Sequence, residues 1–112
     1  MNAIQRIAAC SSLLLLGLTS TSSFAGGDPA AGQKKAQACI ACHGQGGLST
    51  SPTYPILAGQ QEDYLVQALT DYQKGNRKNP IMAGMASPLK KQDIADLAAY
   101  FAKQTSPLAV KR

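Results

Sequence analysis

The amino-acid sequence predicts an all-α fold in one small domain, and three observations support this prediction. Apolar residues recur three and four positions apart in residues 61–74 and again in residues 91–104, which places them on one face of a helix. Residues 30–41 are rich in Ala, Lys and Gln, which favour helices. No segment shows the sustained alternation of apolar and polar residues that is typical of a strand. The 112 residues leave room for a single domain.

Residues 1–25 have the features of a secretory signal peptide. A basic residue precedes an apolar stretch at residues 7–18, and a Ser/Thr run then leads to the small residues Ser23 and Ala25. We expect cleavage after Ala25, which leaves a domain at residues 26–112. The apolar stretch is shorter than the ~20 residues that a membrane span needs. An uncleaved N-terminal anchor is the main alternative.

The first helix is expected to begin at Pro29, because Asp28 is a good N-cap and proline is favoured at the first helical position. It should run to about Ala41. Gly32 lies within it and would permit another helix to approach closely. Residues 44–59 are rich in Gly, Pro, Ser and Thr, and this composition predicts a loop.

Two more helices are expected. The second begins near Gln61 and ends at Gly75, a natural helix stop. Residues 76–88 predict another loop, which carries two of the three methionines. The third helix runs over residues 91–104, with Tyr100 beside an apolar stripe made of Ile94, Leu97, Ala98 and Phe101. Long loops in so small a domain indicate an ordered ligand that they wrap around.

Two cysteines and the only histidine form a C-x-x-C-H motif at residues 39–43. Structural zinc needs four ligands, and residues 26–112 contain no further Cys or His. A redox dithiol is expected at the start of a helix that follows a strand, whereas this motif follows a helix with no strand before it. Cys10, the third cysteine, precedes the leucine run of the signal peptide, which does not fit a lipid anchor.

Covalent haem attachment accounts for every residue of the motif. The thiols of Cys39 and Cys42 would add to the porphyrin vinyl groups as thioethers, and His43 would ligate the iron axially. A covalently held apolar disc would also supply the buried surface that a small domain lacks. We therefore expect one covalently attached haem c.

The sequence resembles the class I c-type cytochromes, especially the small single-haem bacterial periplasmic members and the single-haem halves of dihaem electron-transfer cytochromes. The resemblance covers residues 26–112. Its matching pieces are the Gly-containing first helix, CIACHG, YPILAGQ, NPIMAGMASPL and DIADLAAYFA. It implies the class I cytochrome c fold, with about three main helices and long loops around one haem. It also implies a periplasmic one-electron carrier that is not an enzyme.

The ligand opposite His43 decides between electron carriage and catalysis. A methionine thioether favours ferrous iron and closes the coordination sphere. Met82 and Met85 are the candidates; the resemblance implies Met82, with Met85 as the fallback. The resemblance further implies that the carbonyl of Pro55 accepts the other ring N–H of His43 and fixes its tautomer. A plain turn proline is the alternative for Pro55.

The resemblance implies weaker roles elsewhere. Residues that would line the haem, or belong equally to an ordinary core, are Tyr54, Tyr64, Leu65, Leu69 and Ile81. Arg77 and Asn79 would pair with a haem propionate or stay solvated. Gly32 would lie where the first and last helices cross, against an aromatic residue such as Tyr100.

The full sequence has a formal net charge of +5, and residues 26–112, which lack Arg6, keep +4; this excess favours docking to an acidic partner. The basic residues are scattered and lack the dense patch with interleaved aromatics that nucleic-acid binding needs. Relatives tend to begin the last helix with a Ser-Asp cap, whereas this chain has Lys90 and Lys91, which provide no acceptor for the first N–H groups. We hypothesise that these two lysines contribute to a basic rim for an acidic redox partner.

Two other functions stay open. The chain would serve as a dedicated haem subunit or electron acceptor of one specific oxidoreductase, or as a haem gas sensor whose methionine ligand dissociates. No general acid or base is evident near an open position, and the only histidine is already committed to the iron. An enzyme is therefore not expected.

Overall fold

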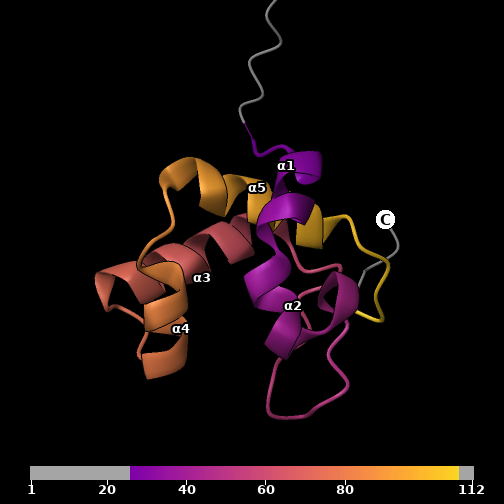
Figure 1. Ribbon diagram of the computed structural model, residues 1–112, viewed down its shortest axis with the longest axis horizontal. Helices are drawn as coiled ribbons and strands as arrows, with labels where there is room; N and C mark the ends of the chain where they lie inside the picture. Colours follow the sequence, from indigo (N-terminus) through magenta and orange to yellow (C-terminus); the bar gives the residue numbers. More distant parts are fainter. Residues whose placement is uncertain (1–25, 109–112) are drawn as a thin grey trace, which may run out of the picture.

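The computed structural model describes residues 26–108, and these residues form helices and loops without a strand. The helices are α1 (Pro29–Lys35), α2 (Gln37–His43), α3 (Glu62–Lys74), α4 (Pro80–Ala86) and α5 (Lys91–Ala102), with a short 3₁₀ turn, η1, at Gln45–Gly47. Helix α5 packs against both α1 and α3, and α4 packs against α3 (Figure 1). The predicted all-α fold is therefore confirmed for the described residues. The expected signal peptide, residues 1–25, lies outside them.

The helix predicted at residues 30–41 begins as expected but is divided in two. The Asp28 carboxylate accepts the backbone N–H of Ala30, and Pro29 occupies the first turn. Ala36 separates α1 from α2, and its carbonyl accepts the N–H of Cys39 at 2.9 Å in a tightened turn. The prediction of one continuous helix is wrong at this point because no Gly or Pro marks the break. Helix α2 also runs on to His43.

Helices α3 and α5 lie close to the residue ranges that the sequence predicts for the second and third helices. Helix α3 ends at Gly75, whose φ of 77° is the left-handed conformation that favours glycine at a helix end. Helix α5 ends two positions before the predicted end at residue 104. Its apolar stripe is buried, with Ile94, Leu97, Ala98 and Phe101 each at most 3% exposed. A core of Ala36, Leu65, Leu97, Ala98 and Phe101 joins α5 to the α1–α2 junction and to α3.

Helix α4 was missed, because residues 76–88 were expected to form a loop. Asn79 caps the helix by accepting the backbone N–H of Met82 at 3.0 Å, and Pro80 occupies the first turn. This Asn-Pro pair repeats the Asp-Pro start signal of α1. The Gly84 within the helix and the nearby Pro88 favoured a loop, but the N-cap and packing against α3 outweigh them.

The start of α5 shows how the chain manages without a Ser-Asp cap. The N-cap residue is Lys90, and its side chain offers no acceptor to the first turn. The Asp93 carboxylate accepts the backbone N–H of Lys90 at 2.8 Å instead. Half of a capping box is thus present, and the negative charge of Asp93 also suits a helix N-terminus.

Candidate functional site

Helix α2 carries the three residues of the C-x-x-C-H motif on one face, because Cys39, Cys42 and His43 are separated by three and four positions. His43 is buried, Cys39 is half-buried against the core, and Cys42 is exposed. Both cysteines are free thiols in the described part of the chain. Burial raises the pKa of the Cys39 thiol, and the neighbouring Cys42 raises it further.

His43 and Pro55 are in direct contact. The Nδ1 atom of the His43 ring lies 2.8 Å from the carbonyl oxygen of Pro55. Since a carbonyl oxygen only accepts hydrogen bonds, Nδ1 carries a proton, and in the neutral ring this is the tautomer whose Nε2 keeps its lone pair. A neutral imidazole with a bare Nε2 is the form that ligates iron. The contact is the one implied for Pro55 at the sequence level.

The loop that presents Pro55 is held by backbone hydrogen bonds. The carbonyl of Gly47 accepts the N–H groups of Leu57 and Ala58 at 2.9 and 3.2 Å, and the carbonyl of Phe101 accepts the N–H of Gly59 at 2.9 Å. Gly47 has a φ of 80°, and a Cβ there would lie 2.8 Å from the Phe101 ring. The loop therefore needs glycine at this position. Tyr54 from the same loop places its ring edge-on to His43, with centroids 6.3 Å apart.

The two candidate methionines lie on α4, three positions apart. Met82 is half-buried and Met85 is 39% exposed. The cap by Asn79 fixes the first turn of α4, in which Met82 donates its backbone N–H. The structure thus places Met82 in an ordered helix instead of the predicted loop.

The other residues expected near the haem have varied surroundings. Leu65 is buried in the core and Leu69 is half-buried. Tyr64 and Ile81 are 48% and 64% exposed. Whether these residues line a haem stays a prediction.

Arg77 and Asn79, expected near a propionate, have protein partners. The guanidinium of Arg77 donates to the Tyr64 hydroxyl at 3.0 Å and stacks 5.0 Å from the centroid of the Tyr72 ring. Asn79 caps α4. These contacts give both residues a local role in the described structure, at the junction of α3 and α4.

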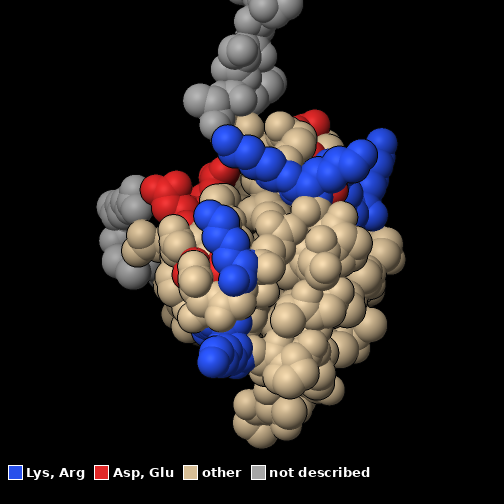
Figure 2. Space-filling view, turned by 90° about the vertical axis from the view of Figure 1, so that its left-hand side faces the viewer, with Lys and Arg blue, Asp and Glu red and all other residues tan. Residues whose placement is uncertain are grey.

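Lys90 and Lys91 are exposed at the start of α5. Figure 2 shows the side of the molecule that includes the end of α3 and helix α4, with basic side chains in separate groups over its upper and middle parts. The lower part of this side carries no charged side chain. The basic groups are dispersed, as the sequence suggested.

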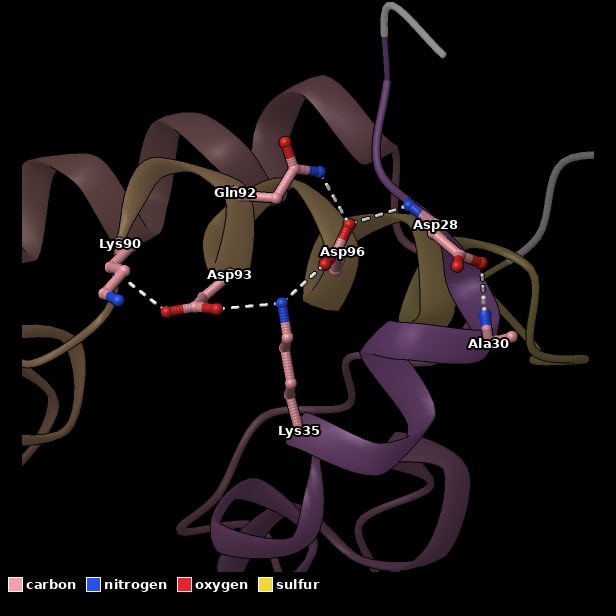
Figure 3. A network of polar contacts seen from close by, with 7 residues as sticks. All are labelled: Asp28, Ala30, Lys35, Lys90, Gln92, Asp93 and Asp96. Atoms are coloured by element: carbon pink, nitrogen blue, oxygen red, sulfur yellow. Dashed lines mark hydrogen bonds and ion pairs between the residues drawn. The ribbon is translucent and has the colours of Figure 1, made fainter. Parts of the chain in front are cut away.

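Sequence reasoning missed Asp96, the one carboxylate that is buried in the described residues, at 3% exposed. Its Oδ2 accepts Lys35 Nζ at 2.6 Å, and its Oδ1 accepts the backbone N–H of Asp28 and the Nε2 of Gln92, both at 2.8 Å (Figure 3). One signal was available. An acidic residue within the apolar run of the last helix needs a partner, although the sequence does not say which one.

The donor set suits a covalently attached haem better than a bare metal ion. Residues 26–108 hold no cluster of three or more His, Cys, Asp or Glu side chains that would converge on one ion. Cys39, Cys42 and His43 instead offer two separate thiols and one ring nitrogen along a helix face. Exposed apolar side chains, at Leu48, Tyr64, Ile81 and Met85, are available to contact a large apolar group.

The fold and this site define a c-type haem protein, and comparison with known proteins agrees. The chain belongs to the cytochrome c family, whose sequence model matches residues 29–105. A cytochrome c domain binds haem c covalently, and the sequence contains one C-x-x-C-H motif. The domain therefore carries a single haem c.

Three curated relatives illustrate the family. Cytochrome c4 of Pseudomonas aeruginosa is 51% identical over 92 residues, which are 82% of this chain and 45% of that protein. Cytochrome c-554(548) of Halomonas halodenitrificans is 44% identical over 81 residues, 70% of this chain and 98% of that protein. A thiosulfate dehydrogenase electron acceptor of Thiomonas intermedia is 38% identical over 101 residues, 89% of this chain and 44% of that protein.

The solved structures give the same picture of the fold. Reduced cytochrome c4 from Pseudomonas stutzeri superposes with a TM-score of 0.68 at 45% identity, covering 70% of this chain and 46% of that one. This likeness confirms the predicted class I cytochrome c fold. The chain spans about half the length of the cytochrome c4 relatives that it matches.

Proposed function

We propose that this protein is a periplasmic one-electron carrier with a single His/Met-ligated haem c. The observation that carries the proposal is the His43–Pro55 contact beside two free thiols on α2. This arrangement prepares a histidine of fixed tautomer next to two covalent attachment points. The bound haem supplies reversible exchange of one electron between ferrous and ferric iron.

The side chains of α2 would hold the haem by three links. Cys39 and Cys42 would form the thioether bonds, and His43 would bind the iron through Nε2. The Pro55 carbonyl keeps Nδ1 protonated and the ring oriented, which raises the basicity of the ligating nitrogen. A ligand whose orientation is fixed in both oxidation states limits the rearrangement that accompanies electron transfer.

Met82 is proposed as the second axial ligand, with Met85 as the fallback. The proposal is supported by the NPIMAGMASPL resemblance and by the capped first turn of α4, which holds the backbone of Met82 in place. The half-buried side chain of Met82 suits a ligand better than the more exposed Met85. A thioether in this position excludes water and other small ligands from the iron.

A periplasmic location is supported by the signal-peptide features of residues 1–25, with cleavage after Ala25 and a domain from residue 26 to 112. Within residues 26–108, no helix is long and apolar enough to cross a membrane.

The redox partners are proposed to present acidic docking surfaces. The support is the net positive charge of residues 26–112 and the exposed pair Lys90 and Lys91, close in sequence to α4. Charge reversal at both lysines should weaken the ionic-strength dependence of electron transfer. An unchanged dependence would contradict this part of the proposal.

An optical redox titration of the purified protein tests the function. We expect a reversible one-electron transition and a haem that stays with the polypeptide after denaturation. Replacing Cys39 and Cys42 by Ser should leave a haem that organic solvent extracts. Absence of a reversible transition in the wild-type protein would overturn the proposed function.

A second candidate is the dedicated haem subunit or electron acceptor of one oxidoreductase. Its support is the 38% identity to a protein described as a thiosulfate dehydrogenase electron acceptor. Gentle purification from the native cell distinguishes the two functions. A stable complex with one oxidoreductase favours the second, and a free protein that reacts with several partners favours the first.

A further inference from the structure

Asp96 links α5 to both ends of α1, which is more than sixty residues away in the sequence. From α5 it contacts Lys35 at the end of α1 and the backbone of Asp28 before α1 (Figure 3). Lys35 also pairs with Asp93 at 2.8 Å, and Asp93 accepts the N–H of Lys90. We call Lys35, Asp93 and Asp96 the acid–lysine clasp.

The buried polar groups of the clasp all have hydrogen-bond partners. Both carboxylate oxygens of Asp96 have donors, and no buried side-chain nitrogen or oxygen in the described residues lacks a partner. Burial alone would raise the pKa of Asp96, but hydrogen bonds from Lys35, Asp28 and Gln92 outweigh it and hold that pKa below its ordinary value. Asp96 is therefore a charged anchor at neutral pH.

The clasp lies where α1 and the residues before it come into close contact with α5. A Cβ on Gly32 would overlap the carbonyl of Asp96 and lie 2.7 Å from the Cβ of Tyr100, so α1 touches the backbone of α5. Gly27 approaches the carbonyl of Ala95 in the same way. The directional hydrogen bonds of the clasp add to these close contacts and favour one register of α1 along α5. Fixing register is the best-attested use of buried ionic groups, which add little net stability.

The register of α1 is passed directly to α2. Lys35 is the last residue of α1 and Gln37 the first of α2, and the single residue between them, Ala36, is 1% exposed within the core. The Ala36 carbonyl accepts the N–H groups of Cys39 and Ile40 at 2.9 and 3.0 Å. A movement at Lys35 therefore moves the first turn of the helix that bears Cys39 and His43.

We propose that Lys35 and Asp96 are positioning residues for the haem-bearing helix: through the α1–α5 register they hold His43 in place to donate to Pro55. The proposal rests on the haem-binding role proposed above for α2. Lys35 and Asp96 lie outside the haem site and would act on it by positioning His43. It also explains why a carboxylate occupies the buried face of α5, where an apolar residue would pack without needing partners.

The test compares two double variants that remove the same charges. Lys35→Gln/Asp96→Asn breaks the clasp, and Lys34→Gln/Asp63→Asn removes a lysine and an aspartate that are exposed and form no ion pair within residues 26–108. The midpoint reduction potential and the Soret circular dichroism of the holoproteins are measured well below the unfolding temperature.

We expect the clasp variant to show a raised potential and an altered Soret signal, since a loosened His43 becomes a weaker donor to ferric iron. The control should match the wild type.

Single variants keep the test decisive if the double variant folds poorly. Lys35→Gln removes a positive charge, and this change alone would lower the reduction potential through space. Loss of positioning would raise it, so the direction of the shift separates the two effects. Lys35→Arg retains both ion pairs and should restore the wild-type potential. Clasp variants that lose thermal stability but keep the wild-type potential and Soret signal would overturn the proposal. A wild-type protein without a reversible one-electron transition would instead overturn the function on which it rests.

Discussion

The Nδ1 of His43 lies 2.8 Å from the carbonyl oxygen of Pro55, twelve residues further along the chain. The hydrogen bond joins the last residue of α2 to a loop that Gly47, Ala58 and Gly59 fasten to the core. It engages Nδ1 of His43 and leaves Nε2 available to bind iron.

Replacing Pro55 by Gly should raise the reduction potential. The carbonyl remains, but a more flexible backbone holds it less firmly, so the imidazole becomes less basic and ferric iron is stabilised less. The expected shift is on the order of 60 mV, which for a one-electron couple equals a tenfold change in equilibrium. Potentiometry measures it. Pro52→Gly, in the same loop, is the control, and an equal shift there would refute a specific role for Pro55.

Replacing Met82 by Ala should abolish the optical band that reports sulfur bound to ferric iron, and should lower the reduction potential, because the soft thioether favours ferrous iron. Met85→Ala should retain the band. The two methionines share α4, so the pair forms its own control. Loss of the band only in the Met85 variant would assign the ligand to Met85.

Replacing Gly32 by Ala should destabilise the fold by about 3 kcal/mol, because the new Cβ overlaps the backbone of Asp96 and forces α1 away from α5. Gly84→Ala is the matched control, since a Cβ there has open space within 4 Å. In the interior of α4 that change should instead stabilise the protein by about 0.5–1 kcal/mol. Denaturant unfolding measures both variants. Equal changes in the free energy of unfolding would contradict the close contact of α1 with α5 at Gly32.

Replacing Asn79 by Ala should cost about 1 kcal/mol, because the N–H of Met82 loses its side-chain acceptor. Asn79→Asp keeps an acceptor and should be close to the wild type. Amide hydrogen exchange should locate the loss in α4. If amide exchange in the Ala variant were faster in α3 and α5 to the same extent as in α4, the cap would not act locally.

Stability should fall at acid pH through the clasp. Hydrogen bonds from Lys35 and then from the Lys90 backbone lower the pKa of Asp93, and the pKa of Asp96 is lowered as well, both from an ordinary value of 3.8. A lowered folded-state pKa gives stability that is present above the unfolded value and is lost as pH falls through the folded one. Melting temperatures should therefore drop below about pH 4. Asp96→Asn should flatten this drop, and an unchanged slope would exclude Asp96 as its source.

The sequence alone determined the chemistry of the molecule and most of its helices. The Asp-Pro start of α1, the apolar stripe of α5 and the Gly75 stop are local signals, and each appears where it was predicted. The spacing of Cys39, Cys42 and His43 likewise needs no tertiary structure, because residues three and four apart share a helix face.

Other features depend on contacts that local patterns do not contain. The break at Ala36 has no Gly or Pro to mark it, and Ala36 itself is buried in the core between α1 and α2. Helix α4 was not predicted, although the Asn-Pro pair before it is a helix start signal; its packing against α3 is a contact that the sequence does not show.

Only the tertiary structure decided why Asp96 is buried. An acidic residue in an apolar run reads as a surface position until its partners are known, and these partners, Asp28 and Lys35, lie more than sixty residues away. The same holds for the His43–Pro55 contact, which the family resemblance suggested and the folded loop supplies. Local periodicity fixes which residues form helices, but the charge and proton of a buried group depend on neighbours that folding alone brings together.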